Sequence, residues 1–230
     1  MTHNDCAHDM MTLAHEVGHA WHSRVLKDHR PFAQGYPMTL AESASTFAEL
    51  ILIEGVADDP EISTGIKLQL AAQELNHSAS FLLDIPVRFK FEKAMYEARK
   101  DGELSISELN ELMTKTQRDV FGDTLVEGQE NPLFWAEKGH FYIAGVSFYN
   151  FPYTYGYLLS RAMVGKLVSE GDGYLENFED FLRMSGSADC EEVAKVTLGA
   201  DLGDPSYWAS SIESFSTTLE RTKTLLSQMD

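Results

Sequence analysis

Cysteine, positive charge and long apolar runs are all scarce in this chain of 230 residues. The two cysteines, Cys6 and Cys190, lie far apart and form no Cys-x-x-Cys pattern, which argues against a disulfide framework and favours a reducing cytoplasm. The longest apolar runs, such as residues 50–53, are too short to cross a membrane. With 18 basic against 36 acidic residues, the net charge of −18 argues against nucleic acid or an anionic membrane as a partner.

Apolar residues recur with helical spacing almost throughout, and no sustained alternation of apolar and polar residues marks a strand. We therefore expect an all-α protein with a single domain over residues 1–230. Pro86 should kink or split the longest helical region, and Ser105 with Glu108 forms a capping box. Helices are expected over residues 9–27, 39–56, 61–100, 105–121, 133–138, 151–170, 175–184, 191–196 and 205–226.

The first expected helix carries the pentad His15-Glu16-Val17-Gly18-His19. Two histidines four positions apart lie one turn apart on the same helix face, so both imidazoles can bind one Zn²⁺. Glu16 can then reach a water molecule held by the metal and take its proton, which is the chemistry of peptide hydrolysis. Glycine inside a helix costs about 1 kcal/mol against alanine, so Gly18 is expected to have a packing reason.

A zinc site of this kind needs a third protein ligand. The metzincin pattern is excluded, because it requires glycine and histidine at the positions of His22 and Val25. Glu42 fits instead, since an antiparallel hairpin brings its helix beside the histidines and the small residues at 41 and 43–45 allow a close approach. Burying a carboxylate among small residues is costly without a partner, and Zn²⁺ supplies one. The alternative is that Glu42 is an ordinary surface residue.

Other polar side chains near the pentad have open interpretations. Glu49 lies two turns after Glu42 on the same face, so it is either a hydrogen-bond acceptor for a ligand imidazole or a surface residue. His22 also faces the site, but packing explains it better than pocket lining. The spacing of His29 and His77 does not suggest ligands.

Tyr149, Tyr153 and Tyr157 recur every four residues and form a stripe along, or just before, one helix face. Their hydroxyl groups can stabilise the negative charge that develops on a substrate carbonyl during hydrolysis. The alternative is an aromatic core stripe. Gly156 and the nearby His140 favour a site-lining role.

Three blocks of the chain, residues 12–22, 41–49 and 139–157, resemble the oligoendopeptidase F branch of the thimet oligopeptidase family and stand in that family's order. The resemblance extends from about residue 9 to the C-terminus. It implies a zincin-like helical domain in which His140 and one or two of the three tyrosines bind the substrate carbonyl and the oxyanion. It places the zinc ligands and the general base at His15, His19, Glu42 and Glu16.

Members of that family are much longer, with a large region before the metal-binding helix, whereas 14 residues precede His15 here. We therefore expect the C-terminal catalytic part of such an enzyme, without the opposite wall of its substrate channel. The expected function is that of a cytoplasmic zinc metalloendopeptidase acting on oligopeptides. The alternatives are a metal-binding or peptide-binding module without turnover and a zinc hydrolase of other carbonyl compounds. Besides oligopeptides, a second copy or a complementing N-terminal part are candidate partners.

Overall fold

The structure is a computed structural model that describes residues 6–171 and 173–229. Every regular element in these ranges is helical and none is a strand, so the predicted all-α fold is confirmed. The described chain divides into two compact units, which we call unit 1 (within Met1–His77 and Tyr155–Asp230) and unit 2 (Ser78–Thr154). The expectation of a single domain over residues 1–230 stays a prediction. No helix in the described ranges is long and apolar enough to cross a membrane.

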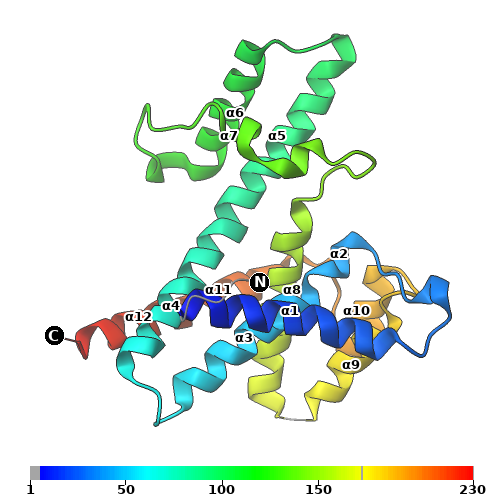
Figure 1. The fold of residues 1–230 in the computed structure, drawn as a ribbon, viewed down its shortest axis with the longest axis vertical. Helices are drawn as coiled ribbons and strands as arrows, with labels where there is room; N and C mark the ends of the chain where they lie inside the picture. Colours follow the sequence, from blue (N-terminus) through cyan, green and yellow to red (C-terminus); the bar gives the residue numbers. More distant parts are fainter. Residues whose placement is uncertain (1–5, 172, 230) are drawn as a thin grey trace. The chain divides into compact units, whose positions relative to one another are not determined.

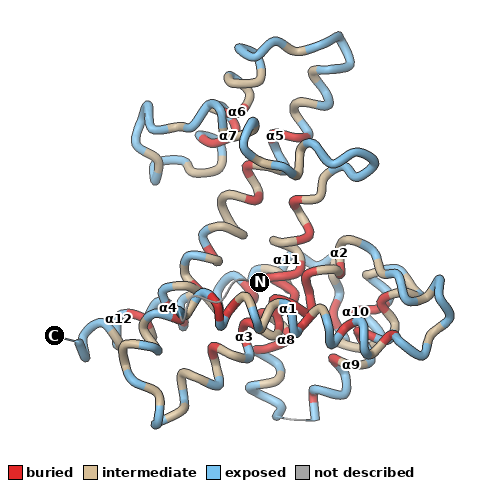
Figure 2. The backbone as a smooth tube through the Cα atoms, in the orientation of Figure 1, coloured by how far each residue is buried: buried red, intermediate tan, exposed pale blue. Residues whose placement is uncertain are grey.

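Unit 1 contains the helix with the pentad and the last third of the chain, which begins within α8 (Figure 1). Its α-helices are α1 (Ala7–Leu26), α2 (Met38–Ala41), α3 (Ser43–Asp58), most of α4 (Thr64–Ala79), most of α8 (Phe151–Glu170), α9 (Tyr174–Met184), α10 (Cys190–Leu198), α11 (Pro205–Glu213) and α12 (Phe215–Ser227). A short 3-10 helix, Pro31–Ala33, interrupts the predicted loop after α1. Most of the buried residues of this unit lie where α1, α3 and α8 pack together (Figure 2).

Helices α1 and α3 run antiparallel, as the hairpin prediction requires. Met11, near the start of α1, packs against Ile53 late in α3, whereas His19 near the end of α1 lies beside Glu42 just before α3. Between these points the helices touch through their backbones, because a Cβ atom on Gly18 would lie 2.6 Å from the Cα of Ser45. The packing reason predicted for Gly18 is therefore a close helix–helix approach that any larger residue would obstruct.

The predicted helix over residues 39–56 is broken at Glu42, and the prediction of one continuous helix was wrong. Glu42 has φ −95° and ψ 0°, so it ends α2 and precedes α3 without being part of either. Its carbonyl oxygen accepts hydrogen bonds from the backbone N–H of Thr46 at 3.0 Å and from the Thr46 hydroxyl at 2.6 Å. The break turns the backbone at the one position where the sequence places a carboxylate among small residues.

A buried ion pair joins α4, α8 and α12 on the other side of unit 1. Arg161 Nη1 lies 2.6 Å from Glu74 Oε1, and both side chains are almost fully buried. Arg161 also donates to the hydroxyl groups of Ser214 and Thr218, so the guanidinium has partners on two further sides. Buried charges require such partners, and the pair therefore ties the C-terminal helix to the rest of unit 1.

Unit 2 is smaller and has its own core around Val87, Phe91 and Met113. Its elements are the end of α4, a π-helix (Ser80–Asp84), α5 (Ile85–Ala98), α6 (Ile106–Phe121), α7 (Phe134–Glu137), the start of α8 and three short 3-10 helices (Arg99–Asp101, Gly122–Thr124 and Gly139–Tyr142). The region predicted to kink or split at Pro86 stays helical through α4, the π-helix and α5, but its α-helical hydrogen-bond pattern is interrupted: proline lacks an N–H, and the turn before it widens so that Ile85 N–H reaches the Ser80 carbonyl. The capping box predicted at Ser105 is also confirmed.

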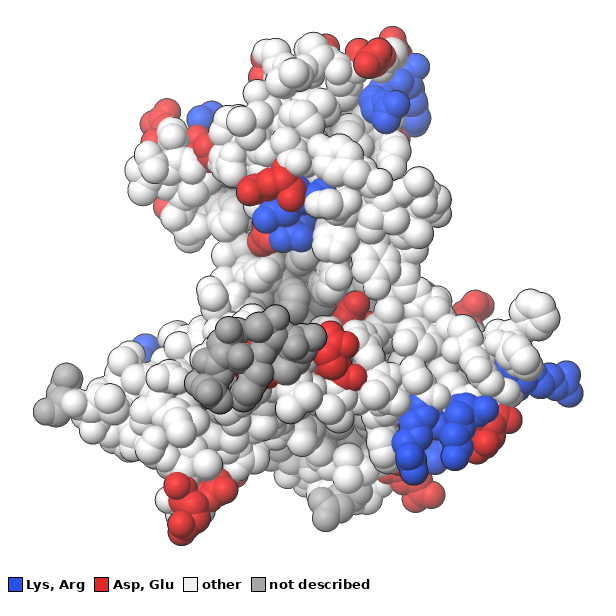
Figure 3. Space-filling view, viewed as in Figure 1, with Lys and Arg blue, Asp and Glu red and all other residues white. Residues whose placement is uncertain are grey.

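Charged side chains on the face drawn in Figure 3 form small groups of both signs, separated by uncharged areas. The excess of acidic residues is therefore dispersed on this face and does not gather in one patch. Dispersed charge of one sign keeps a protein in solution but does not by itself mark a binding site.

Candidate metal centre

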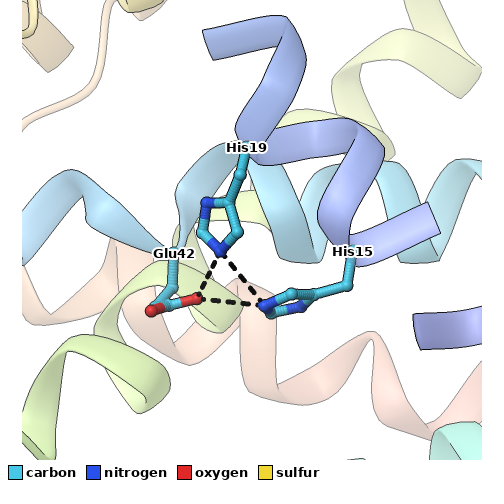
Figure 4. Close-up of side chains that lie close together, drawn as sticks. All are labelled: His15, His19 and Glu42. Carbon is cyan, nitrogen blue, oxygen red and sulfur yellow. Dashed lines mark hydrogen bonds and ion pairs between the residues drawn. The ribbon is translucent and has the colours of Figure 1, made fainter. Parts of the chain in front are cut away.

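Three side chains from α1 and the break before α3 converge in unit 1 (Figure 4). The Nε2 atoms of His15 and His19 are 3.2 Å apart, and Glu42 Oε2 lies 3.5 Å from each of them. The two histidine side chains are 25% and 31% exposed, whereas Glu42 is buried. The three polar atoms thus form a nearly equilateral triangle that is open to solvent on the histidine side.

The triangle has the size that a tetrahedral metal ion requires. The nearest point equidistant from the three atoms lies in their plane about 2.0 Å from each, so an ion just outside that plane lies within the roughly 2.0–2.2 Å of Zn²⁺ bonds to imidazole nitrogen and carboxylate oxygen. Two imidazoles and one carboxylate are also the ligand types that Zn²⁺ takes when its fourth position stays open. The three residues predicted as ligands therefore fit such an ion in both their chemistry and their spacing.

Backbone contacts and one hydroxyl fix the carboxylate of Glu42. Ser45 Oγ lies 3.0 Å from both the carbonyl oxygen and Oε2 of Glu42. Helix α8 also passes so close that a Cβ atom on Gly156 would lie 3.0 Å from the Cβ of Glu42. A carboxylate enclosed in this way has few alternative rotamers, which favours a fixed metal ligand.

Glu49 lies behind His15 and is buried, although sequence reasoning left a surface position open. Its Oε1 accepts a hydrogen bond from His15 Nδ1 at 2.6 Å, and its Oε2 accepts one from His77 Nδ1 at 3.0 Å. Burial lowers the pKa of His15, but the hydrogen bond to Glu49 and the charges of the nearby carboxylates outweigh it and raise the pKa above its ordinary value. Burial raises the pKa of Glu49, yet its two histidine partners bring it below the usual range.

Glu16 and His22 differ sharply in their surroundings. Glu16, the predicted general base, lies in α1 directly after His15 and is exposed. His22 is fully buried, stacks on Tyr36 and lies 2.8 Å through Nε2 from the Ser185 hydroxyl. Burial lowers the pKa of His22 to about 4. The packing interpretation of His22 is therefore confirmed.

The predicted carbonyl-binding residues divide between the two units. In unit 2 the rings of His140, Tyr149 and Tyr153 form a cluster with centroids 5.8–6.0 Å apart. Buried Glu92 supports the loop beside Tyr149, because its carboxylate accepts from the Phe148 N–H at 2.7 Å. Phe148 itself has φ 61°, a strained conformation for a non-glycine residue.

Tyr157 belongs to unit 1 and lies in its core. The side chain is 2% exposed, its ring packs against Phe215 and its hydroxyl lies 3.4 Å from Arg161 Nη1. The four-residue spacing therefore does not give the three tyrosines the same surroundings. The aromatic-core interpretation describes Tyr157, whereas Tyr149 and Tyr153 contact His140.

Sequence reasoning missed His77, the second histidine on Glu49. The two residues are 28 positions apart and lie on different helices, so no local spacing reveals their contact. A weak signal was available within α4, where Gln73 precedes His77 by one turn and the two side chains lie within 3.3 Å.

The family model described as "Peptidase family M3" matches residues 6–213, which is most of the chain. The chain belongs to peptidase family M3. Among members of this family, the chromosomal oligoendopeptidase F of Lactococcus lactis subsp. cremoris is 30% identical over 225 residues, and the oligopeptidase PepF of Bacillus subtilis (strain 168) is 27% identical over 226 residues. The resemblance to oligoendopeptidase F drawn from the sequence is thereby confirmed.

The fold agrees with that of a solved oligoendopeptidase-F. The crystal structure of oligoendopeptidase-F from Enterococcus faecium superposes with a TM-score of 0.72 at 25% identity, over 95% of this chain and 39% of that one. The alignments with the Lactococcus and Bacillus proteins cover 95% and 97% of this chain but 36% and 33% of those proteins. The chain thus spans about a third of the length of these M3 relatives.

Proposed function

We propose that this chain is the metal-binding catalytic region of a zinc-dependent oligoendopeptidase. The observation that carries the proposal is the triangle of His15, His19 and Glu42, which has the ligand types and the spacing of a catalytic zinc site. Membership of the M3 family and relatives named as oligopeptidases support peptides as the substrate class. Two free cysteines fit a reducing compartment such as the cytoplasm.

In this proposal His15, His19 and Glu42 would hold a zinc ion, which would supply a Lewis acid for the scissile carbonyl and for a water molecule. The chain supplies the remaining roles. The exposed carboxylate of Glu16 takes the proton of the attacking water and passes it to the leaving amine. Glu49 accepts the Nδ1–H of His15 and so leaves Nε2 of that imidazole available as a ligand.

We assign carbonyl binding to His140 with Tyr149 and Tyr153, on the strength of their sequence block and their mutual ring contacts. A phenol or imidazole donor aimed at the developing oxyanion contributes about 3 kcal/mol in comparable enzymes. Tyr157 is assigned no such role, since its hydroxyl is engaged inside unit 1.

The test begins with the metal content of the chain purified without added zinc, which should be close to one ion per chain. His15→Ala should abolish binding. Cleavage of quenched fluorescent peptides should stop on chelation, and Glu16→Gln should lower it by roughly 10²–10⁴-fold while the metal stays bound. Glu213→Gln removes an exposed carboxylate elsewhere on unit 1 and should change neither property. A chain without metal, or with activity that survives chelation, would contradict the proposal.

A second candidate function is that of a module that binds zinc or a peptide but does not cleave peptides. The observation behind it is that this chain aligns with about a third of the Lactococcus and Bacillus proteins, so cleavage by those proteins can depend on residues outside the aligned third. A stoichiometric metal content with no cleavage of any peptide would select this candidate. If cleavage then appears on adding the part of the Lactococcus protein that lies outside the alignment, that part is the partner that this chain needs for activity.

A further inference from the structure

The His15–Glu49 pair is one end of a longer row of polar side chains in unit 1. Glu49 Oε2 contacts His77 Nδ1 at 3.0 Å, His77 Nε2 contacts Gln73 Nε2 at 3.3 Å, and Gln73 Nε2 contacts His8 Nδ1 at 3.2 Å. The row runs from α1 across α3 to α4 and back to α1. It thus links the start of the metal-binding helix, at His8, to its middle, at His15, through two other helices.

The direction of each hydrogen bond follows from the chemistry of the groups. An ionised carboxylate only accepts, so the Nδ1 atoms of His15 and His77 must both donate to Glu49. The amide nitrogen of Gln73 only donates, so Nε2 of His77 must accept from it. His77 is therefore held with its single ring proton on Nδ1, directed at Glu49.

We propose that His77 is a positioning residue for the metal ligand His15, which it controls through Glu49, and that Gln73 holds it in the donating tautomer. With Oε2 engaged by His77, the Glu49 carboxylate cannot rotate away, and Oε1 stays aligned on His15 Nδ1. The His15 proton then stays on Nδ1, and its Nε2 keeps a free lone pair for the metal. This inference rests on the proposed function where it concerns the metal.

Two substitutions separate the hydrogen bond of His77 from its volume. His77→Phe keeps a ring of similar size but removes the donor, whereas His77→Asn places an amide nitrogen close to the former Nδ1 and removes the ring. His29→Ala removes a histidine from the loop after α1 and controls for adventitious metal binding. Thermal unfolding of each metal-free variant verifies that it folds.

The first readout is the affinity for Zn²⁺, measured by competition with a chelator. His77→Phe should raise the dissociation constant about tenfold, at the lower end of what loss of an outer hydrogen-bond partner produces. For His77→Asn, which keeps a donor to Glu49, the dissociation constant should stay within about threefold of that of the unaltered chain. His29→Ala should have the same dissociation constant as the unaltered chain. Equal affinities for the unaltered chain and His77→Phe would overturn the inference, as would an equal loss in His77→Phe and His77→Asn.

The second readout needs no metal and no activity. Long-range ¹H–¹⁵N spectra of the imidazoles in the metal-free chain report which nitrogen of His15 carries the proton. The Nδ1–H form should dominate in the unaltered chain and in His77→Asn, and both forms should be present in His77→Phe. An unchanged His15 tautomer in His77→Phe would overturn the inference. If the unaltered chain binds no zinc, the proposed function fails by that result, while these spectra still decide the role of His77.

Discussion

Replacing Gly18 by alanine tests whether the close approach of α1 and α3 sets the geometry of the metal centre. A Cβ atom on Gly18 would lie 2.6 Å from the Cα of Ser45 and also meets the backbone of Ala44. Carbon atoms in contact normally stay about 3.5 Å apart, so the helices must separate locally by about 0.9 Å. Backbone atoms on both sides leave no flexible side chain to absorb this shift.

The separation acts directly on the ligands, because the histidines belong to α1 and Glu42 directly precedes α3. Metal–ligand distances tolerate changes of about 0.2 Å, several times less than the required shift. We therefore expect the dissociation constant for Zn²⁺ to rise at least about tenfold. Overpacking should cost about 1–3 kcal/mol of folding free energy, and the better helix propensity of alanine should return up to about 1 kcal/mol.

The assay combines chelator competition for zinc with urea unfolding of the metal-free chain. Gly55→Ala is the matched control, since Gly55 lies in α3 and a Cβ atom there meets nothing within 4 Å. It should raise the free energy of unfolding by up to about 1 kcal/mol and leave zinc binding unchanged. If Gly18→Ala behaves like Gly55→Ala in both measurements, the close approach does not control the site and the reasoning fails.

Three further substitutions test other parts of unit 1. Gly156→Ala should weaken zinc binding and cost about 1–3 kcal/mol in urea unfolding, because its Cβ would press on the backbone that carries Glu42. As the pH falls from 6.5 to 4, His22 takes up a proton in the unfolded chain but not in the folded one, so the free energy of unfolding should fall by about 3 kcal/mol. His22→Gln should lack this part of the fall, and identical pH profiles of the two chains in urea unfolding would refute the prediction. Arg161→Met removes the guanidinium that faces the buried Glu74 carboxylate on α4 and should cost about 3–5 kcal/mol by thermal or urea unfolding, against under about 1 kcal/mol for Lys166→Ala at an exposed ion pair. Equal costs for these two would contradict the role of the buried pair.

Local signals in the sequence were sufficient for the all-α fold and for the histidine pair, though not for the break at Glu42. The spacing of His15 and His19 places both on one face of α1 whatever surrounds that helix. Gly18 and the small residues after Glu42 indicated a close contact, and the structure has one at that point. These features depend only on helical periodicity and side-chain size, which a single sequence contains.

Contacts that depend on distant segments could not be derived in the same way. The break at Glu42 occurs in a segment whose composition favours a continuous helix, and it lies where α8 crosses at Gly156, more than a hundred positions later. His77 reaches Glu49 only because α4 packs beside α3. The different surroundings of Tyr153 and Tyr157 likewise depend on which unit each belongs to, although both are on α8.

The position of Glu42 depends both on local sequence features and on contacts with distant segments. Gly18 lets α1 approach the backbone of residues 44–45, and Gly156 lets α8 approach the backbone of residues 42–43, so two helices contact the chain at and just after Glu42. The position of the carboxylate is thus set by packing between backbones, and the Ser45 hydroxyl adds a directed contact. A segment that ended after α3 would retain both histidines and Glu42 but would lose the α8 contact that holds the carboxylate in place. The metal centre is therefore a property of the packed helices of unit 1, although its three candidate ligands lie within 28 positions of the sequence.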